Sequence, residues 1–170
     1  MKLLLDEMLK KAVKLLRIFG MDAEFAEGRN DSELLELARG SGAVLVTRDA
    51  ELYSRCLKSG VRGFFVKSDA IEEQIAEMKN GLALRFTFPE KTRCPACNTP
   101  LESVLPNQVK DLVQPNLLDE YEKFYLCRKC NKAYWEGSHW KNITRIYENA
   151  QRIARGEQGF PAMHKRADDP

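Results

Sequence analysis

Two Cys-x-x-Cys pairs in the second half of the chain are the residues best suited to chemistry. They are Cys94 with Cys97 and Cys127 with Cys130. A pair at this spacing presents two thiolates from one tight turn, and Zn²⁺ prefers four such soft ligands in a tetrahedron. An asparagine, which favours tight turns, follows each pair directly. The spacing therefore predicts a structural zinc site built from all four cysteines.

A disulfide framework and a redox-active Cys-x-x-Cys motif are the alternative interpretations. The sequence shows no secretory signal, and disulfides are rare in the cytosol, which disfavours a disulfide framework. Two matched copies of the motif favour structural zinc over redox chemistry. The remaining cysteine, Cys56, falls on an expected helix and is interpreted as a small apolar residue of the interior.

Four aspartates form the second group of candidate functional residues. They are Asp6, Asp31, Asp49 and Asp69. Carboxylates are the protein ligands of Mg²⁺ and Mn²⁺, and metal-dependent phosphodiester hydrolysis uses acidic sites of this kind. Each aspartate is also explained by itself as a helix N-cap, so a metal site and simple caps remain alternative interpretations. Asp6 is the strongest metal candidate, and Asp69 is the weakest because it forms a capping box with Glu72.

The elements that must position these residues alternate along the first half of the chain. Apolar runs predict strands at 2–5, 23–26, 43–47 and 64–66. Helical periodicity and capping residues predict helices at 7–19, 30–39, 49–58 and 68–79. This alternation predicts an α/β fold, a parallel sheet with helices on both faces.

The carboxyl ends of parallel strands share one edge of a sheet, and ligands bind at that edge. If the first and third strands are neighbours, their ends lie about 4.8 Å apart. Asp6 and Asp49 would then repel each other unless a cation lay between them. We expect all four aspartates at this edge, which makes it the candidate site.

The second half is predicted to hold a small zinc ribbon and a final helix. Residues 124–126 and 133–135 flank the second cysteine pair and should form a hairpin. The final helix, 138–155, carries an apolar stripe that should pack on the body of the protein. The expected domains are 1–88, which carries the aspartates, and 89–156, which carries the cysteines. A flexible tail, 157–170, with a weak basic spot at 164–166, should follow.

The charge and hydropathy of the sequence limit the classes of partner that we expect. The formal net charge is +2 at pH 7, and four thiolates with one Zn²⁺ would bring it to about zero. No run of apolar residues is long enough for a membrane span, so we expect no membrane partner and a cytoplasmic location. Residues 128–155 are locally basic, a feature that suits a polyanion but is more often only a solvated surface. The basic residues are Arg128, Lys129, Lys132, Lys141, Arg145, Arg152 and Arg155.

The residues around three of the aspartates resemble the signature of PIN-like nucleases. That signature has an Asp after the first strand, an Asp on a helix, and a Thr-x-Asp at the end of a hydrophobic strand. The corresponding stretches here are Leu3–Asp6, Asp31–Ala38 and Gly42–Asp49. The resemblance implies a nuclease domain in the first half.

From about residue 2 to residue 140, the chain is most similar to one family, named for the RNase domain at the C-terminus of the Mut-seven exonuclease. In that family a PIN-like domain is followed by a zinc ribbon. The similar stretches are Leu5–Leu9, Leu45–Asp49, Ser68–Asp69, Glu73–Gln74, the two cysteine pairs and Tyr134–Trp140. Their combination is specific, although any single stretch would be weak.

The resemblance implies a metal-dependent RNase with structural Zn²⁺ and catalytic Mg²⁺ or Mn²⁺. Asp6, Asp31 and Asp49 would be its metal-binding acids. Fuller PIN domains carry a second acid, a glutamate, on a helix that this chain lacks. Glu33 or Asp69 is the candidate for that catalytic place, and without either the site is incomplete.

RNA contacts are expected from basic residues near the acids. Arg48, beside Asp49, is the first candidate, followed by Lys10 and Lys14 on the helix after Asp6. Lys11 and Arg17 lie on that helix too and are further candidates. The expected task of these side chains is to guide the RNA backbone toward the acids.

Aromatic residues after the second cysteine pair are a further candidate RNA contact. Trp140, His139 and Trp135 are of types that stack on unpaired bases. The alternative interpretation is that the tryptophans join the ribbon to the nuclease domain. His139 is not needed as a zinc ligand, because four thiolates complete the shell.

Three functions remain open at this point. The first is a Mg²⁺- or Mn²⁺-dependent endoribonuclease that hydrolyses phosphodiester bonds in RNA. The second is a non-catalytic RNA-binding adaptor that keeps the PIN-like scaffold and binds through the zinc ribbon. The third is a protein-binding zinc module without affinity for RNA.

Overall fold

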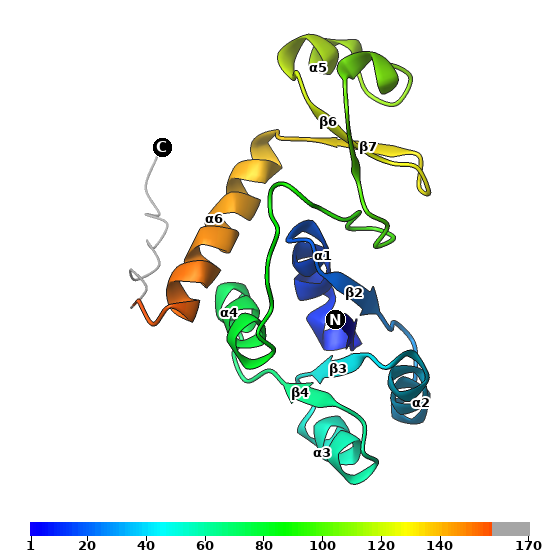
Figure 1. Ribbon diagram of the computed structural model, residues 1–170, viewed down its shortest axis with the longest axis vertical. Helices are drawn as coiled ribbons and strands as arrows, with labels where there is room; N and C mark the ends of the chain where they lie inside the picture. The colour runs from blue at the N-terminus through cyan, green and yellow to red at the C-terminus, as the bar shows by residue number, and fades with distance from the viewer. Residues whose placement is uncertain (158–170) are drawn as a thin grey trace, which may run out of the picture.

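A computed structural model of the chain describes residues 1–157. The predicted tail at 157–170, with its basic spot, lies outside the described residues except for Glu157. The molecule is elongated, with a parallel sheet and its helices at one end and a smaller sheet at the other (Figure 1). A long helix near the C-terminus runs between the two ends.

The first half alternates strands and helices as the sequence predicts. Its strands are β1 (Lys2–Leu5), β2 (Asp22–Phe25), β3 (Val44–Thr47) and β4 (Gly63–Phe65). Its helices are α1 (Lys10–Ile18), α2 (Asp31–Ser41), α3 (Ala50–Lys58) and α4 (Ile71–Gly81). The expected first helix is divided, because a short 3₁₀ turn, η1 (Glu7–Leu9), precedes α1.

The four strands form one parallel sheet in the order β2-β1-β3-β4. β1 therefore lies beside β3, with Leu5 opposite Val46, so the predicted neighbour relation is confirmed. The winding reverses between these two strands, because β2 is added on one side of β1 and β3 on the other. Asp6 directly follows β1 at this reversal point.

Helices cover both faces of the sheet, with α1 and α4 on one side and α2 and α3 on the other (Figure 1). Alternate residues of one strand face opposite ways. Leu3 and Leu5 of β1 accordingly enter the core under α1 and α4, whereas Leu4 enters the core under α2 and α3. Cys56 is fully buried in the second core, as expected for a small apolar residue.

Helix starts agree with the sequence at two places and differ at a third. Asn30 and Glu33 form the predicted capping box of α2, and Asp49 caps α3 by accepting hydrogen bonds from Glu51 and Leu52. The predicted capping box of Asp69 with Glu72 is wrong. Helix α4 is preceded by Ala70 with no side-chain cap, because Asp69 bonds to Arg48 instead.

The smaller sheet is antiparallel, in the order β5-β6-β7, and we call it the ribbon. Its strands are β5 (Glu102–Val104), β6 (Phe124–Cys127) and β7 (Lys132–Trp135). The predicted hairpin around the second cysteine pair is β6–β7, with Phe124 opposite Trp135. Strand β5 was not predicted. The segment between β5 and β6 holds a 3₁₀ turn, η2 (Pro106–Gln108), and a short helix, α5 (Pro115–Glu120).

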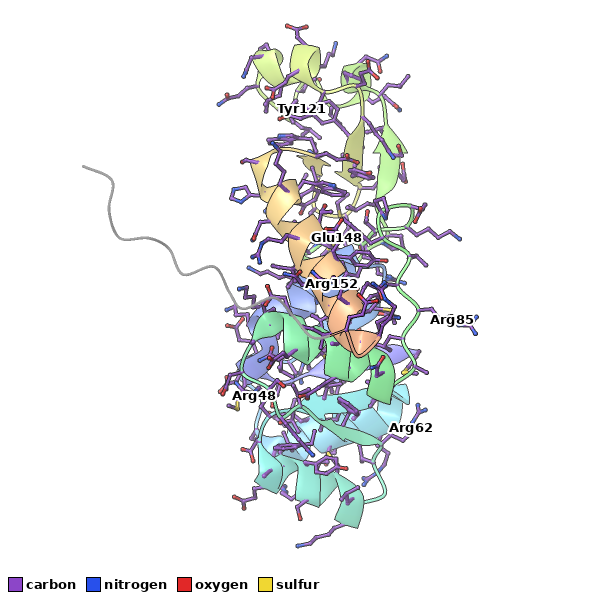
Figure 2. The ribbon with its side chains drawn as sticks, turned by 90° about the vertical axis from the view of Figure 1, so that its left-hand side faces the viewer. Arg48, Arg62, Arg85, Tyr121, Glu148 and Arg152 are labelled. Carbon is purple, nitrogen blue, oxygen red and sulfur yellow. The ribbon has the colours of Figure 1, made fainter. Side chains whose placement is uncertain are left out.

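The final helix, α6 (Ser138–Ala154), packs along α4. Its predicted apolar stripe is confirmed, because Ile146 and Ala150 are buried in the core under α1 and α4. The amide of Asn80 at the end of α4 donates to the Ala154 carbonyl at 2.8 Å. Figure 2 shows α6 crossing from the ribbon to the sheet, with Glu148 and Arg152 on it. This helix therefore ties the two halves together.

Candidate metal centre and candidate nuclease site

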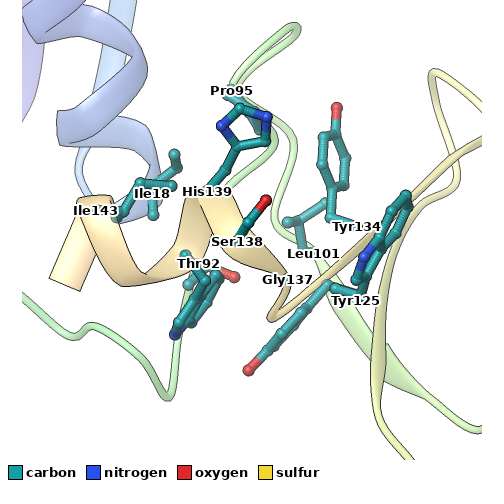
Figure 3. Close-up of a pocket in the computed structure, with 12 residues that line it drawn as sticks. Ile18, Thr92, Pro95, Leu101, Tyr125, Tyr134, Gly137, Ser138, His139 and Ile143 are labelled. Carbon is teal, nitrogen blue, oxygen red and sulfur yellow. The ribbon is translucent and has the colours of Figure 1, made fainter. Parts of the chain in front are cut away.

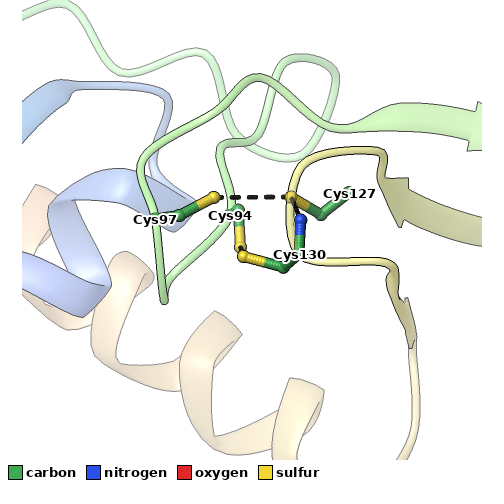
Figure 4. A group of neighbouring side chains, drawn as sticks. All are labelled: Cys94, Cys97, Cys127 and Cys130. Carbon is green, nitrogen blue, oxygen red and sulfur yellow. Dashed lines mark hydrogen bonds between the residues drawn. The ribbon is translucent and has the colours of Figure 1, made fainter.

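The four cysteines of the two pairs come together as the sequence predicts (Figure 4). Their sulfur atoms all lie within 4.8 Å of one another. Cys94 Sγ is 4.0 Å from Cys130 Sγ, and Cys97 Sγ is 3.4 Å from Cys127 Sγ. A tetrahedron with Zn–S bonds of about 2.3 Å has S···S edges of about 3.8 Å. The cluster is thus positioned to bind a metal, and its dimensions are compatible with zinc.

Local turns and hydrogen bonds explain the shape of the cluster. Asn98 and Asn131, which follow the two pairs, both adopt positive φ (67° and 49°), so each closes a left-handed turn. A hydrogen bond with Thr99 lowers the pKa of Cys97 to about 6. The neighbouring thiol of Cys97 raises the pKa of Cys130 to about 12. The neighbouring thiols thus favour ionisation of Cys97 and oppose ionisation of Cys130, and a cation at their centre would let all four ionise.

Arg17 of α1 joins the first cysteine turn to the parallel sheet. Its side chain is 8% exposed. Its Nε donates to the Ala23 carbonyl at 2.7 Å, and its Nη1 donates to the Pro95 and Ala96 carbonyls at 2.8 and 3.1 Å. The expectation that Arg17 guides RNA is therefore wrong, because its charge is buried against backbone carbonyls.

Asp6 is the buried acid at the carboxyl end of the central strands, with 5% of its surface exposed. One carboxylate oxygen accepts a hydrogen bond from the Met8 amide at 3.0 Å, and the other accepts a short hydrogen bond from the Thr47 hydroxyl. Burial raises the pKa of Asp6, hydrogen bonds from Thr47, Met8 and Arg48 oppose that rise, and the charge of Asp49 adds to it. The charge of Asp49 therefore acts on this pKa in the same direction as burial.

Thr47, the last residue of β3, connects the two acids. Its hydroxyl donates to Asp6 and accepts from the Asp49 amide at 2.8 Å. Asp49 uses one carboxylate oxygen to cap α3, and its other oxygen makes no hydrogen bond within residues 1–157. The sequence signal for Thr47 was the Thr-x-Asp pattern, but its bridging role needed the structure.

The other predicted acids are held by different partners. Asp31 at the start of α2 forms an ion pair with Arg55 of α3 at 2.7 Å. Asp69 is largely exposed and pairs with Arg48. Glu33 accepts from the Asn30 amide at 2.9 Å as part of its capping box. Among the described residues, the cysteines are the only group of three or more acidic, histidine or cysteine side chains close enough to share a metal.

Arg48 lines a cavity of about 280 Å³ beside Asp69 and the start of α4. Its Nη2 is bonded to Asp69, whereas its Nε is buried and has no hydrogen-bond partner in the described part of the chain. A buried unpaired donor costs free energy. Lys11 also lines this cavity.

The remaining basic residues that were predicted to contact RNA differ in whether they already form ion pairs. Lys10 pairs with Glu27 at 2.7 Å, whereas Lys14 is exposed on α1 with no ion pair to another described residue. On α6, Arg145 pairs with Glu72 and Arg152 pairs with Glu157, and Arg155, directly after α6, also pairs with Glu157. The basic surface of α6 is therefore partly neutralised by nearby acids.

Trp140 and His139 lie at the start of α6, where the ribbon meets the rest of the molecule. Trp140 stacks on Tyr125 of the ribbon, with ring centroids 5.6 Å apart, and packs against Phe88 at 5.0 Å. The alternative that a tryptophan joins the two halves is thus correct for Trp140. His139 is exposed and is not part of the cysteine cluster.

A family model described as the Mut7-C RNAse domain matches residues 1–147. The chain belongs to the Mut7-C RNAse domain family. No curated protein and no solved structure matched it. Membership in the Mut7-C family indicates an RNase-like function with RNA as the substrate class. None of the helices within residues 1–157 has the length and apolar character needed to cross a bilayer.

Proposed function

We propose that the protein is a Mg²⁺- or Mn²⁺-dependent endoribonuclease whose catalytic ion is held by Asp6 and Asp49. The observation that carries the proposal is Asp6, a buried acid at the reversal point of the parallel sheet, which the Thr47 hydroxyl links to the backbone of Asp49. Ligand sites of open parallel sheets lie at such reversal points. The family match over residues 1–147 supports RNA as the substrate.

The residues at this edge fit a hard divalent ion. Mg²⁺ is commonly held by only one or two carboxylates, with waters and substrate phosphates as the other ligands. Asp6 supplies a carboxylate oriented by Thr47 and Met8, and Asp49 supplies an oxygen that is free within the described residues. A bound ion would activate water and neutralise charge on the phosphate.

Other side chains of the chain would position the substrate. Arg48 would contact a phosphate from the cavity that its side chain lines, one residue before Asp49. Lys10 and Lys14, at the start and middle of α1, would attract the RNA backbone from the same side. Asp31 could join the metal site only by releasing Arg55, and Asp69 could act only by releasing Arg48.

The ribbon would have a structural part in this enzyme. We propose Zn²⁺ as the ion of the cysteine cluster, because four thiolates complete a tetrahedral shell and leave no open position for substrate. The hydrogen bonds of Arg17 would then fix the zinc-bearing turn to the sheet.

Cleavage of a labelled single-stranded RNA by the zinc-loaded protein tests the proposal. With Mn²⁺ present, the wild type should cut the RNA internally, and Asp6→Asn should reduce the rate at least about a hundredfold, because the buried carboxylate is lost. Glu7→Gln is the matched control, since Glu7 is the exposed neighbouring acid. Equal rates in wild type and Asp6→Asn would contradict the proposal.

A non-catalytic RNA-binding adaptor is the second candidate. The observation that favours it is the absence, within residues 1–157, of a third carboxylate close enough to share an ion with Asp6 and Asp49. The adaptor would bind RNA with strong salt dependence and show no Mn²⁺-dependent cleavage. Asp6→Asn would leave that binding unchanged.

A further inference from the structure

A second cavity, separate from the acidic edge, lies where the ribbon, the first cysteine turn, the end of α1 and the start of α6 meet (Figure 3). Its volume is about 280 Å³. Side chains from all four parts face it, and its walls are mostly apolar and aromatic. Its lining includes Ile18, Pro95, Tyr125, Tyr134, Trp135 and Trp140. We call it the aromatic pocket.

The aromatic pocket offers ring faces rather than polar groups. Tyr125 donates its hydroxyl hydrogen bond to Glu136 at 2.8 Å, and the Tyr134 hydroxyl lies 3.2 Å from the Cys94 sulfur. Both hydroxyls are therefore already engaged. Trp140 is fixed by its stacking on Tyr125. Such walls suit a flat aromatic ligand, held by stacking and shape more than by hydrogen bonds.

The mouth of the pocket is formed by residues that remain accessible. Ser138 and His139 at the first turn of α6 are exposed, and Figure 3 shows both side chains at the pocket. Trp135 is half-buried on β7. An extended ligand could thus place one ring inside while the rest of it stays in water.

Helix α1 connects the aromatic pocket with the acidic edge. Lys11, Lys14 and Ile18 are spaced by three and four residues, so they lie on one face of this helix. Lys11 lines the cavity of Arg48, and Ile18 lines the aromatic pocket. Both lysines are exposed, and neither forms an ion pair with another described residue. Nine residues at about 1.5 Å each give α1 a length of about 14 Å.

We propose that the aromatic pocket binds one unpaired nucleobase of the RNA whose phosphodiester lies at Asp6, and that the phosphates between them pass along Lys14 and Lys11. The inference rests on the proposed function, because it takes RNA as the ligand. Aromatic walls for a base and unpaired cations for phosphates are together complementary to single-stranded RNA. Because stacking tolerates every base, this anchor selects unpaired over paired RNA without selecting a sequence.

Intrinsic tryptophan fluorescence tests the proposal directly. The chain has two tryptophans, Trp135 and Trp140, and both line the pocket. The zinc-loaded full chain is titrated, without Mn²⁺ or Mg²⁺, with hexauridylate and with an abasic ribose-phosphate hexamer of the same charge. Hexauridylate should quench the fluorescence, and the abasic hexamer should bind more weakly without quenching.

Two variants that add the same ring to α6 sharpen the test. Ser138→Phe fills the pocket with a ring and should weaken hexauridylate binding roughly tenfold, the scale of one lost base stack. Asn142→Phe is the matched control, because Asn142 is exposed on α6 and does not line the pocket, and this variant should bind as the wild type does. Thermal unfolding of both variants verifies that the ribbon remains folded.

The experiments distinguish failure of the proposal that the pocket binds a base from failure of the proposal that the protein is a nuclease. Equal quenching by the abasic hexamer, no quenching at all, or unchanged binding by Ser138→Phe would each overturn the pocket, whatever the rate of cleavage. Base-dependent quenching without Mn²⁺-dependent cleavage of the same RNA would keep the pocket and reject the nuclease. Quenching by an apolar peptide but not by hexauridylate would assign the pocket to a protein ligand and overturn the proposal.

Discussion

The cysteine cluster and the acidic edge of the parallel sheet are both made of residue types that bind metals, but they are assembled in different ways. The four sulfur atoms lie within 4.8 Å of one another, whereas the four predicted aspartates form no comparable group within residues 1–157. Each cysteine pair is brought together by a single turn, so only two turns must meet. The aspartates are brought together only by the winding of the whole sheet, and arginines hold two of them.

The cysteine cluster is a site that the fold requires, whereas the acidic edge is a site that a ligand would complete. Four thiolates around one ion leave no position for substrate, and the surrounding ribbon has a small core of its own. A hard ion held by Asp6 and Asp49 would instead take its other ligands from waters and substrate phosphate. We therefore expect loss of the first metal to affect folding and loss of the second to affect only chemistry.

Removal of the metal from the cysteine cluster should have the largest effect. Zinc binding contributes about 10–16 kcal/mol in small modules, so chelation or Cys127→Ser should unfold the ribbon. Amide hydrogen exchange should show lost protection in β5–β7 and retained protection in β1–β4. Cys56→Ala, outside the cluster, is the control. Protected ribbon amides after complete chelation would contradict this view.

Replacement of Arg17 by Met should have the next largest effect. Three carbonyls, those of Ala23, Pro95 and Ala96, would lose a charged donor in a buried site. Hydrogen bonds to charged groups contribute about 1.5–3 kcal/mol each, so the free energy of unfolding should fall by about 3 kcal/mol or more. Chemical denaturation of the zinc-loaded protein measures it.

Arg93→Met provides the matched control for this substitution. The Arg93 side chain is half-buried and donates a single hydrogen bond, to the Asn98 carbonyl at 2.8 Å. The loss of this one hydrogen bond from a charged donor should lower the free energy of unfolding by about 1.5 kcal/mol. Equal decreases in the free energy of unfolding of the two variants would argue against a special role for Arg17 in joining the two halves of the molecule.

The pKa of Asp6 predicts a pH-dependent stability at the acidic edge. Burial raises this pKa in the folded protein, so the protonated form favours folding and the ionised form opposes it. As the pH rises from below 3.8, without divalent ions at this edge, the wild type should lose stability relative to Asp6→Asn. The loss is about 1.4 kcal/mol for each unit by which folding raises the pKa.

Denaturation of both proteins across acidic and neutral pH, with zinc bound, measures this difference. A stability difference that does not change with pH would show that folding leaves the pKa of Asp6 at its ordinary value. Saturating Mn²⁺ should reverse the trend at neutral pH, because an ion at Asp6 stabilises the carboxylate.

Breaking the ion pair between Asp31 and Arg55 should have the smallest effect of these changes on stability and metal binding. Arg55→Gln removes the ion pair that holds this acid, a partly exposed pair of the kind worth about 0.2–1 kcal/mol. If Asp31 joins the catalytic ion, Mn²⁺ affinity should rise up to about fivefold in Arg55→Gln. Calorimetric titration of the zinc-loaded protein measures this, and Arg39→Gln on α2 serves as the control. Unchanged affinity would leave Asp31 outside the metal site.

Sequence patterns predicted the parts of this molecule whose contacts are local or periodic. Asn30 with Glu33 marked the start of α2, the cysteine spacing marked two turns, and the stripe of Ile146 and Ala150 marked the buried side of α6. The parallel sheet with helices on both faces followed from the alternation of apolar runs and helical periods. These features depend on neighbours within one or two turns.

The parts that the sequence could not predict depend on contacts between distant segments. Strand β5 has only three residues, too few to show alternation, and pairs with β6 across a long segment. Arg17 looked like its exposed lysine neighbours, because nothing local shows that the Pro95 carbonyl lies above it. Asp69 was predicted to cap α4 but bonds to Arg48 instead. This contact likewise depends on how β3 and β4 bring the two segments together.

A double-mutant cycle on Asp6 and Asp49 tests the central claim most directly. Single-turnover cleavage of one labelled RNA with Mn²⁺ is measured for wild type, Asp6→Asn, Asp49→Asn and the double variant. Asn is also a good helix cap, so Asp49→Asn should keep α3 intact. If both acids hold one ion, each single variant and the double variant should fall to the same low rate, because residues that act as a unit are not additive. Two results would contradict a shared catalytic ion. One is a double variant whose rate falls by the product of the two single reductions, and the other is full activity in Asp49→Asn.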